Sequence, residues 1–260
     1  MNQSRTPENP PRRRPWQKTH FGTWLGLGLW SLLADTGILR HRAVAGPWAI
    51  ARTALSDLRA GSLLADVAAS AARVAAGVSL GLCAGLLLGA SVGLAGARRQ
   101  RMEPTLDFLR AVPPLFVFSL LLLSLGYGES ARVLAVAWAA ALIVALHVSD
   151  AVASVHHERL RTLRAMRATP LQLLRWLYLY ELMPACLLSL RQAVTNGLIV
   201  AVVTEMLVGA PHGLGTRALS AQIAYDAPRL YTTIFLTGAL GLAGSRLILA
   251  AQRKLVTWHS

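Results

Sequence analysis

Two stretches of the sequence contain residue types that could do catalytic chemistry. Residues 89–93 read Gly-Ala-Ser-Val-Gly, the letters of a nucleophile elbow. That motif needs a strand, a sharp turn and a helix, whereas this serine lies inside a long apolar run. His157 and Glu158 begin like a zinc-protease motif, but Arg161 occupies the position of the second histidine. We therefore predict no catalytic residue and no metal site.

The two lysines exclude an ATPase. A phosphate-binding loop, GxxxxGK[ST], needs a glycine directly before its lysine. Here Lys18 follows Gln17 and Lys254 follows Arg253. We therefore predict that the chain is not an enzyme and binds no cofactor of its own.

Two ionisable residues inside an apolar run are candidates for a functional site. Glu205 lies near one end of the run and Arg191 within it. Burying a charge in a bilayer costs ~2.5–3.5 kcal/mol or more on insertion scales, so such residues are functional candidates by default. Glu205 could serve function, or it could pair with Arg191 or Arg217 or cap a break in the backbone. Arg191 is predicted to face the interior, as a counter-charge for an anion or as the partner of Glu205.

The elements that position these residues are apolar blocks long enough to cross a bilayer. The chain has 260 residues, of which 54% are hydrophobic, and a span needs roughly 20 apolar residues. The net charge of +14 would suit nucleic acid, but most charges lie between the apolar blocks, so we predict membrane topology instead. The chain is predicted to be an all-α polytopic membrane protein with about six transmembrane helices.

The blocks divide the chain as follows. Residues 1–20 form a disordered cytoplasmic tail, 21–39 an uncleaved first span, 40–72 an outer amphipathic segment, and 73–255 a core of five spans at residues 73–97, 106–126, 131–149, 185–208 and 230–251. Arginines and lysines favour the cytoplasmic side. With both termini inside, the bias is about two to one in favour of the cytoplasmic side, and residues 40–73 hold most of the exceptions.

Small residues and prolines predict two packing features. Five glycines recur every four residues, which lets a neighbouring helix approach closely: Gly77, Gly81, Gly85, Gly89 and Gly93. Pro113 and Pro114 break the next span near its start, which is tolerable in a bilayer where neighbouring protein satisfies the freed carbonyls. We therefore expect a buried kink there, followed by a tight turn at Gly126 and Gly128.

A basic stretch interrupts the apolar blocks at residues 156–184, within a cytoplasmic loop at 150–184. Leu160, Leu163 and Met166 repeat at helical spacing beside a stripe of arginines. Thr169, Pro170 and Gln172 then carry the signals of a fresh helix start. The loop is predicted to be two helices with an elbow at residues 167–169, and either a docking device or an amphipathic helix on anionic lipid.

The loop resembles the coupling motif of ABC importer permeases, which reads Glu-Ala-Ala, then a glycine three residues later, then Ile-x-Leu-Pro. Four further segments resemble the nitrate, sulfonate and taurine branch of that family in the same order: residues 70–77 (SAARVAAG), 108–115 (FLRAVPPL), 125–130 (LGYGES) and 204–215 (TEMLVGAPHGLG). The similarity covers about residues 60–255. It departs from the family where Arg161 replaces the glutamate and Arg167 the elbow glycine, and a proline expected near Phe118 is missing.

The resemblance implies a type I ABC importer permease in a bacterial inner membrane. It implies a paired permease or homodimer, two ATP-binding subunits that use the ATP, a periplasmic substrate-binding protein and a small, often anionic solute. The ATPase-coupling residues would be Arg161, Leu163, Arg164, Met166, Arg167, Ala168, Thr169, Pro170, Leu171 and Pro184. The pathway or gate residues would be Pro113, Pro114, Arg191, Glu205, Met206, Gly213 and Gly215.

Two alternatives from other classes stay open. An intramembrane hydrolase would need a pair such as Ser91 and His147 at one depth. An ion-coupled secondary transporter would show inverted repeats with broken helices, and we find no repeat between the halves of the sequence.

Overall fold

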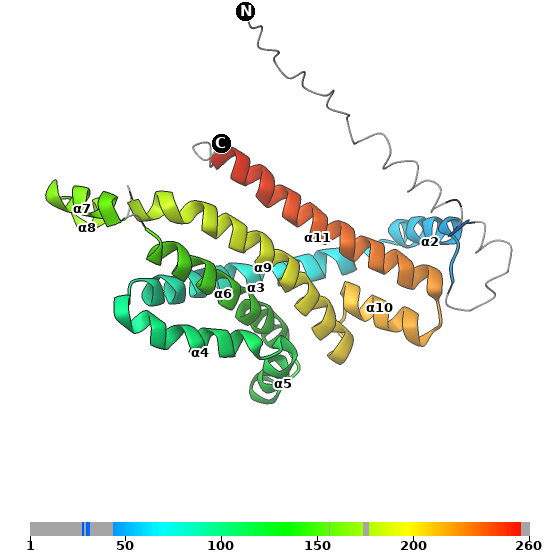
Figure 1. Ribbon diagram of the computed structural model, residues 1–260. Helices are drawn as coiled ribbons and strands as arrows, with labels where there is room; N and C mark the ends of the chain where they lie inside the picture. Colours follow the sequence, from blue (N-terminus) through cyan, green and yellow to red (C-terminus); the bar gives the residue numbers. More distant parts are fainter. Residues whose placement is uncertain (1–27, 29, 32–43, 156, 174–176, 256–260) are drawn as a thin grey trace, which may run out of the picture.

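The computed structural model describes residues 28, 30–31, 44–155, 157–173 and 177–255, and in these ranges it contains helices and turns but no strand. Figure 1 shows the long helices bundled together, with α7 and α8 projecting at one end and α10 lying toward the other; we call these the α7 end and the α10 end. In chain order the elements are α2 (Pro47–Arg59), α3 (Ser62–Gly93), the 3-10 helix η2 (Gly96–Arg98), α4 (Arg99–Ala111), α5 (Pro114–Leu125), α6 (Glu129–Ala153), α7 (His157–Ala165), α8 (Pro170–Leu173), α9 (Leu179–Val208), α10 (Leu214–Ile223) and α11 (Ala227–Leu255).

Helix α6 is the centre of the bundle, with α3 and α9 packed against it. Its alanines Ala131, Ala135, Ala140 and Ala145 are fully buried. The five striped glycines of α3 face α6 so closely that a Cβ on any of them would lie 2.5–2.6 Å from an atom of that helix. Real Cβ atoms do not approach so closely, so the glycine stripe is what allows these two helices to touch along their length.

The predicted break at the two prolines separates two helices. Helices α4 and α5 meet at Pro113 with a bend of 80°, because proline lacks the N–H that would continue the ladder. The expectation of a buried kink is wrong for the single chain, since Pro113 is exposed and Pro114 only half-buried. The turn at Gly126 forms as expected, with Gly126 at φ +77°, a region that glycine adopts without a Cβ clash.

Among the described residues, four helices are long and apolar enough to span a membrane: Ser62–Gly93, Glu129–Ala153, Leu179–Val208 and Ala227–Lys254. The bent pair α4 and α5 would make a fifth. The predicted first span at residues 21–39 falls almost wholly outside the described residues.

Three predicted boundaries differ from the structure. The outer segment was expected to reach residue 72, but α3 already begins at Ser62 and continues without a break through the glycine stripe. Pro184 was expected at the start of a span, yet it lies inside α9, which begins at Leu179. Helix α6 extends to Ala153, so the connecting loop is shorter than 150–184 at both ends. In each case a helix extends into residues that the sequence pattern placed outside the span.

Candidate functional site

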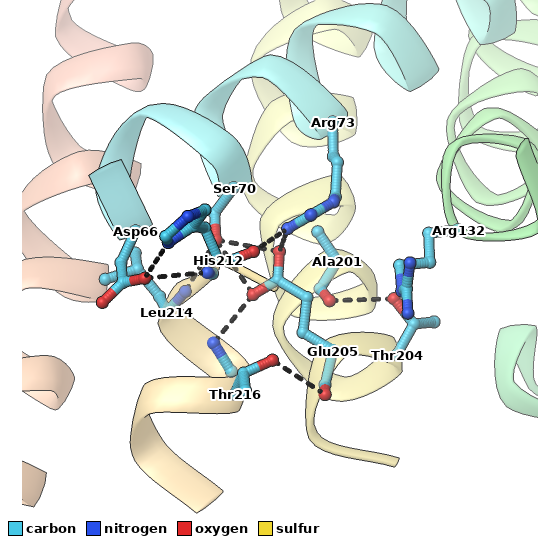
Figure 2. Close-up of polar contacts among 12 residues, drawn as sticks. Asp66, Ser70, Arg73, Arg132, Ala201, Thr204, Glu205, His212, Leu214 and Thr216 are labelled. Carbon is cyan, nitrogen blue, oxygen red and sulfur yellow. Dashed lines mark hydrogen bonds and ion pairs between the residues drawn. The ribbon is translucent and has the colours of Figure 1, made fainter. Parts of the chain in front are cut away.

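The carboxylate of Glu205 lies at the α10 end and is completely buried. The hydroxyl of Ser70 donates to its two oxygens at 2.8 and 2.9 Å, the Nη1 of Arg73 at 2.7 Å, and the backbone N–H of Gly215 at 2.8 Å. Figure 2 shows these groups converging on Glu205 from α3 and from the first turn of α10. The charge is therefore held by a guanidinium and by dipoles, which offset the loss of water.

The guanidinium of Arg73 joins several elements at one point. Besides Glu205 of α9, its Nε and Nη2 donate to Glu129 of α6 at 2.6 and 2.8 Å. Its Nη1 also donates to the backbone carbonyl of His212 at 2.8 Å. Arginine suits this position because its planar fork presents donors in several directions.

Two glycines let the chain between α9 and α10 reach the carboxylate. Gly213 has φ +157°, and a Cβ there would lie 2.5 Å from Oε2 of Glu205. A Cβ on Gly215 would lie 2.1 Å from the carbonyl oxygen of Val202. Both of these predicted pathway residues therefore lie beside Glu205, where their role is close backbone approach.

Further ion pairs adjoin this cluster, and we call the four carboxylates and four guanidiniums of the two groups the charge network; Arg229 also pairs with Asp226 at 3.7 Å. Glu129 also pairs with Arg132 at 3.2 Å, and Arg132 bonds to the carbonyl of Gly209. Arg217 pairs with Asp66 at 3.1 Å and with Asp57, and Arg229 pairs with Asp57 at 3.2 Å. The members of the network are Asp57, Asp66, Glu129, Glu205, Arg73, Arg132, Arg217 and Arg229.

The partner predicted for Glu205 is wrong. Its partner is Arg73, while Arg217 serves Asp57 and Asp66. Arg191 is exposed rather than facing the interior of the chain, and its Nε donates to the hydroxyl of Ser245 at 2.7 Å. Met206, predicted beside Glu205, is half-buried.

The charge network is built to hold the segment from Gly209 to Arg217 in place. Glu205 has no surface open to a solute, and both its oxygens are engaged. Asp66 accepts the N–H of Gly213 at 3.1 Å and Ser70 accepts that of Leu214 at 2.9 Å. The structural interpretation of Glu205 is therefore the better supported one.

The pair Ser91 and His147 does not form a catalytic arrangement. The Ser91 hydroxyl donates to the carbonyl of Leu88 at 2.7 Å, and Nδ1 of His147 lies 2.8 Å from the carbonyl of Ile143. Each side chain thus bonds to its own helix.

At the α7 end, α7 and α8 form a helix-elbow-helix. Arg167 has φ +56°, so it adopts the left-handed turn that a glycine would favour. Thr169 starts α8 with a reciprocal capping box: its N–H donates to Oε1 of Gln172 at 2.8 Å, and its Oγ1 accepts the Gln172 N–H at 3.3 Å. The elbow therefore keeps its left-handed turn with arginine in place of glycine.

The elbow presents apolar side chains to the surroundings. Met166 and Leu171 are each 73% exposed. Arg161, Arg167 and Thr169 are exposed as well, whereas Leu163 and Ala168 are half-buried. Arg164 lies in α7 and Pro170 begins α8. Arg159 pairs with Glu181 of α9 at 3.2 Å, which ties the loop to the bundle.

Comparisons with known proteins identify the family. Residues 81–257 match the binding-protein-dependent transport system inner membrane component family. The chain belongs to this family. A probable ABC transporter permease of Brucella abortus (strain 2308) is 30% identical over 235 residues, which is 90% of this chain and 92% of the relative.

Two named relatives are similar as well. The taurine transport system permease TauC of Escherichia coli (strain K12) is 30% identical over 174 residues, 65% of this chain and 61% of that protein. The putative aliphatic sulfonates transport permease SsuC of Bacillus subtilis (strain 168) is 24% identical over 254 residues, 97% and 92% of the two chains. The chain is thus an ABC transporter permease, a multi-pass membrane transport subunit rather than an enzyme.

Solved structures show the same fold. A chain of the inward-facing MetNI methionine ABC transporter matches with a TM-score of 0.61 and 21% identity, covering 72% of the permease and 95% of that chain. A chain of a bacterial ABC transporter that imports the acidic polysaccharide alginate matches with a TM-score of 0.63 and 12% identity, covering 91% and 95%. The predicted ABC importer permease fold is confirmed.

Sequence reasoning missed most of the charge network. Ser70 and Arg73 lie in the motif at residues 70–77, but they were not assigned a role. One signal could have indicated Arg73. It lies three residues after Ser70 and four before Gly77, so all three residues share the helix face that meets α6. Its partner Glu205 lies 132 residues away, so the sequence around Arg73 could not predict the pair.

Proposed function

We propose that this permease forms the translocation pathway of an ATP-driven importer for a small, anionic solute of the sulfonate, taurine or nitrate kind. A separate ATPase would drive it through residues 156–184. Both termini would be cytoplasmic, so the α7 end would face the cytoplasm and the α10 end the outside. The names of TauC and SsuC support the solute class.

The observation that carries the coupling proposal is the projecting elbow. Met166 and Leu171 flank it, and both are 73% exposed. Helices α7 and α8 project beyond the long helices (Figure 1). Exposed apolar side chains at such a position favour a protein partner. The left-handed Arg167 and the capping box fix the angle between the two helices.

The full assembly would contain a second permease, two ATP-binding subunits and a periplasmic substrate-binding protein. ATP would be bound and hydrolysed by the ATP-binding subunits alone. The charge network would hold the segment Gly209–Arg217 on the outer face, where a binding protein would dock.

The coupling proposal is tested by purifying the permease from its native membrane with its partners. Met166→Asp combined with Leu171→Asp should abolish recovery of the ATPase, because two carboxylates would be buried against the partner. The amount of permease in the membrane should not change. The matched control is Gln100→Asp, which adds a carboxylate at an exposed position of α4 at the same end. Equal ATPase recovery from the double variant and the control would refute the proposal.

A further inference from the structure

Two adjoining cavities lie between α4, α6 and α9. One has a volume of about 420 Å³ and reaches Asp150 near the α7 end; the other, of about 280 Å³, extends toward Asn196 and Val200. Arg110, Ile143 and Gln192 line both cavities. We call the two together the α4/α6/α9 groove.

The inner part of the groove lies at the middle depth of the bundle. Its α6 residues, Leu142 and Ile143, lie close to the midpoint of Glu129–Ala153. Gln192 and Asn196 lie equally close to the midpoint of Leu179–Val208. Being four residues apart, they share one face of α9. Both are exposed in the single chain.

Polar side chains at this depth do not face lipid. An unpaired amide in hydrocarbon costs several kcal/mol (~4–8), and ionisable residues in spans face a water-filled path or other protein. The Asn196 amide donates to the carbonyl of Gln192 at 3.1 Å, which leaves its side-chain oxygen without a partner among the described residues. The groove is therefore the polar surface of these spans at middle depth.

Arg110 differs from the arginines of the charge network. Its side chain is 63% exposed, and its one ion pair within the described part of the chain is with Asp107 at 3.8 Å, itself 61% exposed. Exposed pairs of this kind contribute ~0–1 kcal/mol. By contrast, the side chain of Arg73 is 7% exposed and is held by two carboxylates. Arg110 thus brings an available guanidinium into the groove.

We propose that the groove is an anion site on the solute's path, in which Arg110 takes an oxyanion head group. Gln192 and Asn196 would supply amide N–H donors opposite it. A guanidinium binds sulfonate-type or carboxylate oxygens through paired hydrogen bonds. This inference rests on the proposed transport of a small anion and adds its contact residues.

The acidic residues of the groove do not oppose this assignment. Glu103 and Asp150 line the part nearer the α7 end and share the single guanidinium of Arg99, Asp150 at 2.6 Å, so this outer part keeps a net negative charge. The anion site is therefore the inner cavity, in which Arg110 is the one charged residue among the described lining residues. Asp107 competes with the solute for Arg110. Its pair is weak enough to be displaced, so Asp107 sets the strength of the anion site without closing it.

Thiol modification in the assembled transporter tests the site without knowledge of the solute. In a background of Cys83→Ser and Cys186→Ser, Ile143→Cys puts a thiol in both cavities and leaves every polar side chain of the groove intact. The probes are 2-sulfonatoethyl methanethiosulfonate, an anion, and 2-(trimethylammonium)ethyl methanethiosulfonate, a cation. The measured quantity is the anion-to-cation ratio of modification rates, each divided by the rate with a free thiol.

With Arg110 present, the anion-to-cation ratio should exceed one. Arg110→Gln should lower the ratio about tenfold, because one unit charge near the thiol is lost. Arg110→Lys should keep it, and Asp107→Asn should raise it. Ethanesulfonate at millimolar concentration should slow modification, whereas choline should not. As a control, Ile223→Cys on α10, which is exposed and lies outside both the spans and the groove, should give a ratio that Arg110→Gln does not change.

Three results would overturn the proposal: no reaction of Ile143→Cys with either probe, a ratio that Arg110→Gln leaves unchanged, or equal loss in Arg110→Lys and Arg110→Gln. Size-exclusion profiles of the variants separate loss of fold from loss of charge. None of these readouts needs ATP or transport. A negative result for the anion site is therefore distinguishable from a negative result for the coupling proposal, which is tested at Met166 and Leu171.

Discussion

Replacing Glu205 with glutamine should be among the most damaging isosteric substitutions in this permease. The side chain keeps its shape but loses its charge inside a fully buried site. A carboxylate accepts from Ser70, Arg73 and Gly215 together. An amide has a single acceptor oxygen, and its NH₂ must then face another donor.

The magnitude follows from these contacts. Hydrogen bonds to charged groups contribute about 1.5–3 kcal/mol each, and breaking a buried ion pair by removing one partner costs about 3–5 kcal/mol. Glu205→Gln loses at least one such bond and creates a donor–donor clash, so we expect a loss of about 3–5 kcal/mol. For a chain of this size that corresponds to a melting temperature lower by about 10 °C.

The assay is the melting temperature of the detergent-solubilised permease, followed by size exclusion after heating. Glu129→Gln is the matched control, because Glu129 pairs with the same Arg73 guanidinium but its side chain is 55% exposed. Solvent screens that pair, so its loss should cost no more than about 1 kcal/mol. The argument that burial makes this carboxylate indispensable would be refuted if Glu205→Gln had the melting temperature of the wild type. It would also be refuted if Glu129→Gln lowered the melting temperature as much as Glu205→Gln.

Two further pairs of substitutions test the helix packing and the elbow. Gly85→Val should abolish the folded, monodisperse protein, because a Cβ there lies 2.6 Å from the carbonyl of Ala141, whereas Gly238→Val, with nothing within 4 Å, should fold normally; equal yields would contradict the role of the stripe. Arg167→Gly should preserve or slow hydrogen exchange of the Ala168 amide, which bonds to Leu163 at 3.0 Å, because glycine avoids the roughly 1–2 kcal/mol cost of a left-handed residue. Arg167→Val should speed that exchange, and the opposite order would show that the left-handed turn is not what strains the elbow.

Local patterns predicted the parts of the fold that depend on local geometry. Glycine spacing in α3 indicated the face that α6 covers, Pro113 marked the break before α5, and Thr169 with Gln172 indicated the start of α8. Each signal lies within a few turns of the structure it specifies. The same reasoning failed at residues 62–72, which were assigned to an outer amphipathic segment, whereas Asp66 is paired inside the bundle and α3 continues through it.

The partners of buried charges could not be predicted, since they lie far apart in the sequence. Asp57 pairs with Arg217 and Arg229 across 160 and 172 residues. The candidates for Glu205 were chosen from nearby residues, Arg191 and Arg217, while its partner Arg73 comes from another helix. The α4/α6/α9 groove could not be predicted from the sequence either, because Arg110 and Gln192 come together only when α4, α6 and α9 pack.

The charge network also accounts for arginines that weakened the topology argument. With both termini inside, Arg73, Arg217 and Arg229 fall on the outer side, against the usual bias. Each pairs with carboxylates there. Without these arginines, Asp57 and Glu205 would be buried and unpaired, which costs far more than a departure from a statistical bias. Their position at the α10 end is therefore a requirement of the network, and it does not argue against the proposed cytoplasmic termini.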